Sequence, residues 1–283
     1  MQNQDTPVLL ARREGAVLHL TLNRPQARNA MNARLLEELI DAFEAVAACS
    51  EVRAVVLRGS GGNFCAGGDV KDFARIRRQE AAPGTDPVAA FNRRFGTLLE
   101  LANGVPQAVV VAAEGAVLGG GFGLACVADV TIARNDASFG MPETSLGVIP
   151  AQIAPFVVQR IGLSQARRLG VCGGRFDGAE ASRLGLAHYV EDSEAALDAR
   201  VAQVLAQVMR CAPGANAVTK QIMLAVGGEP LGQVLDRAAA LFSAALCGPE
   251  AAEGTQAFME KRLPQWALAG IGNKEEMGDE HVR

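Results

Sequence analysis

Aromatic residues are scarce in this 283-residue sequence: Phe, Trp and Tyr together make up 5% of it, with one Trp and one Tyr. The core must therefore be built mainly from Ala, Val and Leu. An excess of basic charge is also missing, because 27 Lys and Arg face 31 Asp and Glu, which gives a net charge of −4. Nucleic-acid-binding domains normally carry a basic excess, so we expect no nucleic-acid partner.

Paired cysteine motifs are absent as well. The lack of a CxxC pair argues against a zinc site or a disulfide framework and fits a reducing compartment. The start of the chain lacks a basic segment followed by an apolar one, as a signal peptide would have. The most apolar stretch, residues 106–130, is interrupted by Glu114 and by glycines, so it is not a membrane span. We expect a cytoplasmic protein with no membrane partner.

What the sequence has is ordinary globular composition, with 49% hydrophobic and 20% charged residues, and an alternation of strand and helix patterns. The patterns predict a hairpin turning at Glu14-Gly15, then strands and helices in alternation up to about Ala151, and almost only helices from Glu194 to Lys261. Predicted helices cover Ala33–Ala48, the residues from Val70 and Ala89–Leu101, and predicted strands cover Arg53–Leu57, Ala108–Ala113 and Val130–Ala133. We therefore expect an α/β core over residues 1–193 and a helical region over 194–283, with a frayed end from Ala269.

Several common catalytic motifs are missing. The sequence has no GxSxG, HExxH or GxxxxGK[ST], and Leu124 takes the last position of a GxGxxG counted from Gly119. Nucleophilic serine chemistry, zinc peptidase chemistry, P-loop chemistry and nicotinamide binding are therefore disfavoured. There are three histidines, and His19 and His188 are better interpreted as structural or solvated than as catalytic.

Two glycine-rich loops follow predicted strands and enter helices. The first is NFCAGGD at residues 63–69, and the second is EGAVLGGGFG at residues 114–123. Glycines at a helix start leave backbone N–H groups free, and two such loops side by side could hold an oxygen that develops negative charge. The alternative is that these glycines only permit tight turns and close packing.

A third feature is Glu143, in the loop FGMPE. A loop glutamate is most often a solvated charge. Glu143, however, is nearly alone as a carboxylate in an apolar, glycine-rich stretch from Phe139 to Phe156. Burial there would raise its pKa and suit it to general acid–base catalysis.

These features together resemble the crotonase (enoyl-CoA hydratase/isomerase) superfamily. The motifs LNRPQARNAMN, FCAGGD, GAVLGGGFGLACVADV, FGMPETSLGVIP and AFMEKRLP occur in the order and spacing of that family, over roughly residues 8–265. The resemblance implies a spiral of ββα units with a C-terminal helical part that forms trimers, and usually a dimer of trimers. It also implies an acyl-CoA substrate and a thioester enolate held by two backbone N–H groups.

The resemblance assigns roles to individual positions. Gly68 and Gly120 match the N–H donors, and Glu143 matches the catalytic acid–base. Residues matching the CoA-binding positions are Ala66 and Asp69 beside the adenine, Arg24 and Arg28 near the phosphates, and Phe242 and Lys261 reaching the CoA of a neighbouring subunit. Helix packing and a solvated charge remain open alternatives for the last two. No metal or redox cofactor is implied, since coenzyme A is part of the substrate.

The sequence departs from the family at Gly123, where typical hydratases carry a second glutamate. This replacement removes a charge, and we expect it to open space beside the acyl chain and to make Gly123 a substrate-contacting position. A second departure is PAQIAPFVVQRIG at residues 150–162. This version resembles the branch that includes isohexenylglutaconyl-CoA and 3-methylglutaconyl-CoA hydratases, which act in acyclic terpene and leucine breakdown.

We therefore expect a hydratase that adds water to the α,β double bond of a branched glutaconyl-type enoyl-CoA. Glu143 would act as base on water and then supply the proton at C2. A Δ3,Δ2-enoyl-CoA isomerase is the alternative enzyme, because one glutamate suffices to move a proton between C2 and C4. A non-catalytic acyl-CoA- or RNA-binding relative is the alternative from another class.

Overall fold

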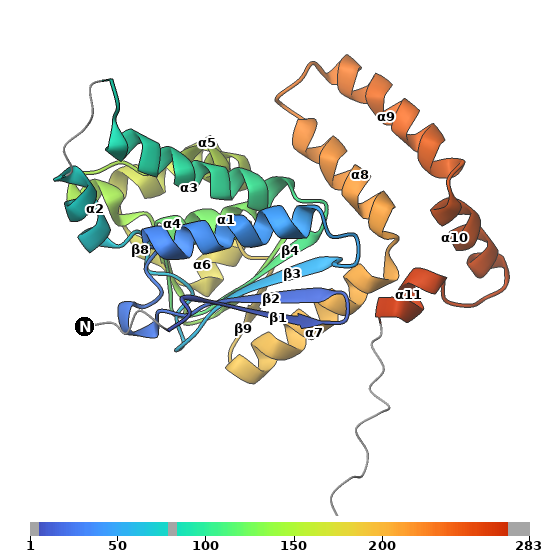
Figure 1. Ribbon diagram of the computed structural model, residues 1–283, viewed down its shortest axis with the longest axis horizontal. Helices are drawn as coiled ribbons and strands as arrows, with labels where there is room; N and C mark the ends of the chain where they lie inside the picture. The colour runs from blue at the N-terminus through green and yellow to red at the C-terminus, as the bar shows by residue number, and fades with distance from the viewer. Residues whose placement is uncertain (1–5, 79–83, 271–283) are drawn as a thin grey trace, which may run out of the picture.

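The computed structural model describes residues 6–78 and 84–270, and it is organised around two sheets (Figure 1). The larger sheet has the strand order β1-β2-β3-β4-β6-β9, in which β1 and β2 form the expected hairpin and the other neighbours are parallel. Its strands are β1 (Leu9–Glu14), β2 (Val17–Leu22), β3 (Ala54–Gly59), β4 (Ala108–Ala113), β6 (Val130–Arg134) and β9 (Tyr189–Glu191). The smaller sheet contains β5 (Ala116–Leu118), β7 (Ser138–Gly140) and β8 (Arg175–Phe176).

The helices connect and cover these strands. In chain order they are η1 (Pro25–Ala27), α1 (Ala33–Ala47), α2 (Val70–Arg77), α3 (Pro87–Gly104), α4 (Gly120–Val127), η2 (Pro142–Leu146), α5 (Ala154–Cys172), α6 (Gly178–Arg183), α7 (Glu194–Arg210), α8 (Pro213–Ala225), α9 (Leu231–Leu246), α10 (Pro249–Met259) and α11 (Gln265–Gly270). The predicted long elements are confirmed, including α1, α3, β3 and β4. The expected frayed end lies mostly outside the described residues.

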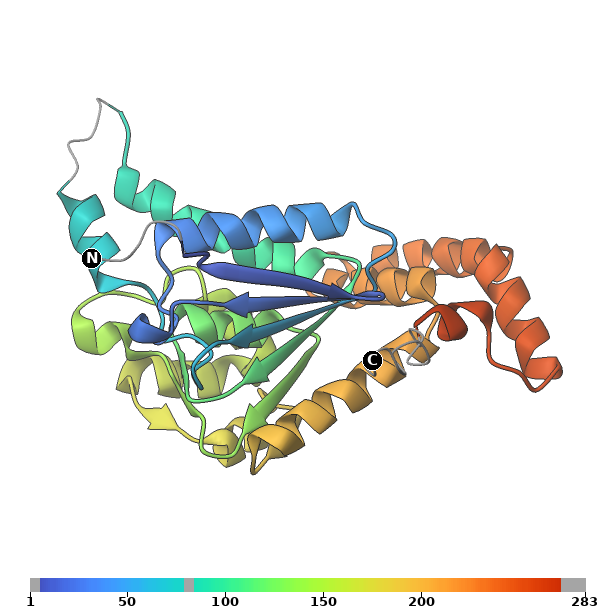
Figure 2. The same ribbon diagram turned by 60° about the horizontal axis from the view of Figure 1, so that its bottom comes forward.

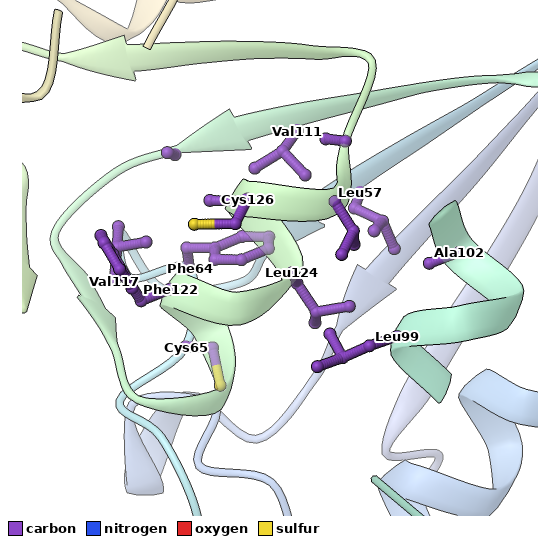
Figure 3. Packing of buried hydrophobic residues seen from close by; sticks show 14 of the residues in the cluster. Leu57, Phe64, Cys65, Leu99, Ala102, Val111, Val117, Phe122, Leu124 and Cys126 are labelled. Carbon is purple, nitrogen blue, oxygen red and sulfur yellow. The ribbon is translucent and has the colours of Figure 1, made fainter. Parts of the chain in front are cut away.

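The central parallel strands of the larger sheet, β3, β4 and β6, are buried on both faces, as parallel strands usually are. Leu57 and Val111 face the main core under α1 and α3, together with Phe122 of α4 (Figure 3). Side chains that alternate with these along the strands, such as Val56, point to the other face of the sheet and pack against Leu197 and its neighbours in α7. Figure 2 shows α7 running along that face of the sheet. Short aliphatic side chains fill most of both layers, which explains how a core forms with few aromatics.

The chain repeats one unit, a long strand followed by a short extended segment and then a helix. In two units the short segment is β5 or β7, which pair in parallel with each other. In the two earlier units it is only an isolated bridge, at Met31 with Gly68 and at Cys65 with Val117. The four segments thus lie in register beside one another, and the expected ββα repetition is confirmed.

Helices α8, α9 and α10 extend away from the sheets (Figures 1 and 2). At their base the Arg53 guanidinium of the strand region donates to the carbonyl oxygens of Met209 at 3.0 Å and Trp266 at 2.6 Å. Since α7 packs on the sheet, the helices that stand apart begin at α8, and the boundary at residue 194 stays a prediction. No helix in the described part of the chain is long and apolar enough to cross a membrane.

Candidate active site

The two glycine loops lie side by side. The Cys65 N–H donates to the Ala116 carbonyl at 2.8 Å, and the Leu118 N–H donates to the Cys65 carbonyl at 2.9 Å. Three residues beyond the bridge between Cys65 and Val117, the two segments reach Gly68 and Gly120. Equal spacing from one bridge places these two glycines at matching positions of neighbouring units, each at the start of a helix.

Both glycines keep a free backbone donor. Met31 donates to the Gly67 carbonyl at 2.7 Å and accepts from the Asp69 N–H at 2.9 Å, so the N–H of Gly68 points away from the Met31 segment. Gly120 is the first residue of α4, where a helix has no internal acceptor for the N–H. Within the described ranges neither N–H has a protein acceptor. The pair therefore suits an oxygen that becomes an oxyanion.

Glu143 is brought to this pair by the unit of β7, which follows the two units that carry the glycines. Strand β7 pairs with β5, and the Gly119 N–H donates to the Gly140 carbonyl at 3.0 Å, just before the turn into η2. Gly119 has φ +49° and ψ −115°, a conformation open essentially to glycine. A Cβ added there would lie 2.8 Å from Glu143 Oε1. The carboxylate thus lies directly against the backbone that precedes the Gly120 donor.

The surroundings of Glu143 favour its neutral form. Burial raises the pKa of this carboxyl, and its Oε2 is buried with no hydrogen-bond partner in the described part of the chain. Glu114 shows the contrast, since this carboxylate is more deeply buried than Glu143 and accepts from Arg58 Nε at 2.8 Å. An unpaired buried carboxyl that can hold or release a proton is the environment expected of a general acid–base.

A pH-dependent stability follows from this burial. Glu143→Gln should melt at a higher temperature than the wild type at pH 8. The difference in melting temperature should shrink towards zero as the pH falls to about 4.5, the ordinary pKa of a glutamate. The reason is that a raised pKa in the folded state makes ionisation destabilising, so the wild type loses stability as the pH rises through that pKa. Thermal unfolding across this pH range measures it. A difference that is constant with pH would mean that Glu143 is not desolvated.

The structure corrects the role expected for Arg24. Its side chain is 5% exposed and its Nη2 donates to Asp69 Oδ2 at 2.8 Å, so a CoA phosphate cannot reach it. Asp69 in turn accepts from the Lys71 N–H at 3.0 Å and caps α2. Arg24 thus holds the first glycine loop against η1 instead of meeting CoA, whereas the contact of Asp69 with CoA stays a prediction.

Arg28 and Ala66 fit their expected places better. The Arg28 carbonyl accepts from the Ala66 N–H at 2.9 Å, which puts Arg28 at the edge of the first glycine loop. The Arg28 side chain is exposed, and no hydrogen bond or ion pair of it occurs among the described residues. It is free to meet a phosphate, and its contact with CoA stays a prediction.

Phe242 and Lys261 are not brought to the site of their own chain. Phe242 lies on α9 and is 67% exposed, and Lys261 follows α10 and is also exposed. Both elements stand away from the glycine loops (Figures 1 and 2). Only a second subunit could bring these side chains to a bound CoA, and that contact remains a prediction.

The space expected beside Gly123 is filled. A Cβ on residue 123 would lie 3.1 Å from Ile153 Cβ, closer still to Ile153 Cγ2, and 3.6 Å from Leu99 Cδ1. The expectation of an open gap was wrong because the loop before α5 returns over α4 and places a β-branched side chain there. Sequence spacing within α4 could not reveal a contact supplied 30 residues further along the chain.

Three phenylalanines were missed as site residues. The Phe73 ring lies on Gly68, the Phe95 ring lies on Gly120, and Phe73 meets Phe91 edge to face with 6.3 Å between centroids. Phe73 and Phe95 thus fill the side-chain positions of the two glycines, and Phe91 packs behind Phe73. The spacing of Phe91 and Phe95, one helical turn apart on α3, was the available signal.

Other reactive groups near the loops are structural. Burial raises the pKa of the Cys65 thiol to about 11, so it is no nucleophile at neutral pH. His188 Nδ1 accepts from the Thr131 N–H at 3.0 Å, and His19 lies beside Glu14. These contacts agree with the structural role expected for the two histidines.

Known proteins are similar to this chain in sequence and fold. The family described as "Enoyl-CoA hydratase/isomerase" matches residues 12–268. The structure of an enoyl-CoA hydratase/isomerase from Marinobacter aquaeolei is 52% identical, covers 92% of this chain and 99% of its own, and superposes with a TM-score of 0.89. Pseudomonas aeruginosa AtuE is 55% identical over 92% of this chain and 100% of its own, with a TM-score of 0.88. The 2,3-dehydroadipyl-CoA hydratase of Escherichia coli is 30% identical over 91% of this chain and 98% of its own. With nearly its whole length matched, the chain belongs to the enoyl-CoA hydratase/isomerase family.

Proposed function

We propose that this protein is an enoyl-CoA hydratase for branched glutaconyl-type acyl chains, with isohexenylglutaconyl-CoA as first and 3-methylglutaconyl-CoA as second candidate substrate. The observation that carries the hydratase proposal is the unpaired, buried Glu143 beside the free N–H groups of Gly68 and Gly120. Family membership and relatives named as hydratases support it. The finer substrate rests on the resemblance of residues 150–162 to the branch that acts on such chains.

The proposed reaction needs only groups of this chain and the substrate. The thioester oxygen accepts hydrogen bonds from the Gly68 and Gly120 N–H groups, each worth about 3–4 kcal/mol as the enolate forms. Glu143 takes a proton from water as the oxygen adds to C3, and then gives that proton to C2. The elements of water are thereby added across the double bond, and Glu143 returns to its starting state. We propose no cofactor besides the CoA that the substrate carries.

The proposal of a carboxylated acyl chain is supported by position 123, where this chain has glycine. A glutamate at that position would carry a charge that repels a substrate carboxylate.

The isomerase alternative is favoured by the single carboxylate, because moving a proton from C4 to C2 requires one base and no activated water. A non-catalytic relative is less well supported. Such a scaffold would have no need to keep an unpaired carboxyl buried at a cost in stability, as Glu143 is here.

One substrate panel separates these functions. Crotonyl-CoA, 3-methylglutaconyl-CoA and isohexenylglutaconyl-CoA should lose their enoyl thioester absorbance as water adds, fastest for the glutaconyl substrates. A 3-enoyl-CoA should gain that absorbance if the protein is an isomerase. Glu143→Gln serves as the matched control in each assay. No absorbance change with any acyl-CoA would overturn the enzymatic proposal in favour of binding alone.

We also propose that the protein works as a trimer or a dimer of trimers. Large apolar side chains are exposed along the extended helices, and they are Met223, Leu224, Val226, Leu231, Leu235, Phe242, Leu246, Phe258 and Met259. Exposed apolar groups of this number on one segment are typical of a subunit interface. Sedimentation that shows a stable, active monomer would contradict this proposal.

Lys261→Ala tests whether a neighbouring subunit contributes to CoA binding. We expect KM for an enoyl-CoA to rise about tenfold, as for loss of one charged hydrogen bond, with a smaller change in kcat. Arg12→Ala removes an equally exposed charge on β1 and should leave KM unchanged. If steady-state kinetics give the same KM for Lys261→Ala and Arg12→Ala, Lys261 does not contribute to CoA binding.

A further inference from the structure

The start of helix α4 packs against both Glu143 and Ile153. Gly119 precedes the first turn of α4 and Gly123 lies in it, since the Gly123 N–H donates to the Gly119 carbonyl at 2.9 Å. A Cβ on residue 119 would meet Glu143 Oε1, and a Cβ on residue 123 would meet Ile153. The carboxylate and the isoleucine therefore cover two positions of α4 that are four residues apart.

Ile153 cannot easily leave this position. It is 3% exposed, and its Cβ carries two branches that restrict its rotamers. Its backbone begins α5, where the Ile153 carbonyl accepts from the Val157 N–H at 3.0 Å and the Ala154 N–H donates to the Pro150 carbonyl at 3.0 Å. Because the contact with residue 123 involves Cβ and Cγ2 rather than a flexible chain end, relief requires the backbone of this turn to move.

We propose that Ile153 is a specificity-determining residue that keeps this site at one carboxylate. Its side chain fills the volume that any side chain on residue 123 would need, so a second acidic group cannot be placed beside Glu143 while Ile153 is present. Gly123 and Ile153 thus form one packed unit, although the sequence shows them as two separate departures from the family pattern. The consequence for hydration rests on the proposed function, whereas the packing does not.

The packing is tested by the sign of a stability change. Gly123 lies inside α4 without a positive φ, so Gly→Ala should normally raise the melting temperature by about 2–4 °C through helix propensity. We expect Gly123→Ala to lower it by at least about 2 °C in the wild type, because the new methyl overpacks against Ile153. In the Ile153→Ala background the same change should raise the melting temperature.

Two controls accompany this series. Ile153→Val keeps both branches at Cβ, so it should not relieve Gly123→Ala. Gly170→Ala adds a methyl inside α5, where it would meet Met141 Cε at 3.6 Å, an ordinary contact distance. This variant should raise the melting temperature in either background. A stabilising Gly123→Ala in the wild type would overturn the inference.

The chemical consequence is tested with a carboxylate. Gly123→Glu should hydrate crotonyl-CoA at least tenfold more slowly than the wild type, and Gly123→Glu with Ile153→Ala should recover at least tenfold over that single variant. Compared with the wild type, the double variant should also shift the ratio of kcat/KM for crotonyl-CoA over 3-methylglutaconyl-CoA at least tenfold towards crotonyl-CoA. The reason is that the second carboxylate can then hold water and repels the substrate carboxylate. A gain of this kind is not produced by a merely structural residue.

The two proposals fail in different ways. If the wild type hydrates no enoyl-CoA but the sign of Gly123→Ala still reverses with Ile153→Ala, the proposed function is wrong and the packing inference stands. If the wild type is a hydratase and Gly123→Glu alone is as stable and as active on crotonyl-CoA as the double variant, the inference about Ile153 is wrong and the function stands.

Discussion

Glu143→Gln should lower kcat for hydration by about 10²–10⁴-fold, while the Kd for free CoA stays within twofold. The amide keeps the shape of the side chain but cannot cycle a proton between water and C2. Stopped-flow or steady-state loss of enoyl absorbance gives kcat, and competition by CoA gives the affinity. A variant with more than a tenth of wild-type activity would place the base elsewhere.

Glu114→Gln is the matched control for this change. Glu114 is the other buried carboxylate near the site, and it is paired with Arg58 at 2.8 Å rather than left without a partner. Its amide variant should unfold at a lower temperature because an ion pair is broken, yet keep kcat while folded. The two variants thus separate proton chemistry from structural support.

Gly119→Ala should have the second largest effect, with kcat reduced about 100-fold. The residue has φ +49° and ψ −115°, so a Cβ strains the backbone, and the methyl would lie 2.8 Å from Glu143 Oε1. Displacement of the carboxylate by about 1 Å is enough to cost two orders of magnitude in rate. The N–H of Gly120, next in sequence, moves with the same strained backbone.

Gly15→Ala controls for the backbone strain alone. Gly15 has φ +55° in the hairpin turn, and an added Cβ there would meet nothing within 4 Å. Both variants should lose stability from the left-handed conformation, and only Gly119→Ala should lose kcat. Equal kcat in the two variants would mean that the Gly119 backbone does not position the base.

The residues alone indicated the two glycine-rich loops, which stand where strands pass into helices, and Glu143, which stands almost alone in an apolar stretch. The choice of Gly68 and Gly120 as donors came from the family resemblance, and the roles of all three residues stay predictions. The long elements were predictable because sequence periodicity is also a local feature. Strands such as β5 and β7 span three residues each, which is too short for an alternating pattern to be recognised.

The remaining site depends on contacts between distant segments. Whether Arg24 faces solvent or the core is decided by Asp69, which lies 45 positions away. Whether position 123 is open is decided by Ile153, which arrives from the loop before another helix. The sequence therefore shows which positions carry a charge or lack a side chain. Only the tertiary packing decides whether such a position faces solvent, a substrate or the core.

The register of the short extended segments has a consequence for how freely the chain can change length. Gly68, Gly120 and Glu143 belong to three successive units, and bridges between neighbouring segments fix the offset of each unit from the next. Turns outside these segments, such as the one at Gly15 between β1 and β2, do not enter this alignment. Insertions or deletions there would leave the spacing of the three groups intact, whereas a one-residue slip within a bridged segment would turn its N–H groups to the opposite side. The spacing of Gly68, Gly120 and Glu143 therefore does not depend on the length of turns that lie outside the bridged segments.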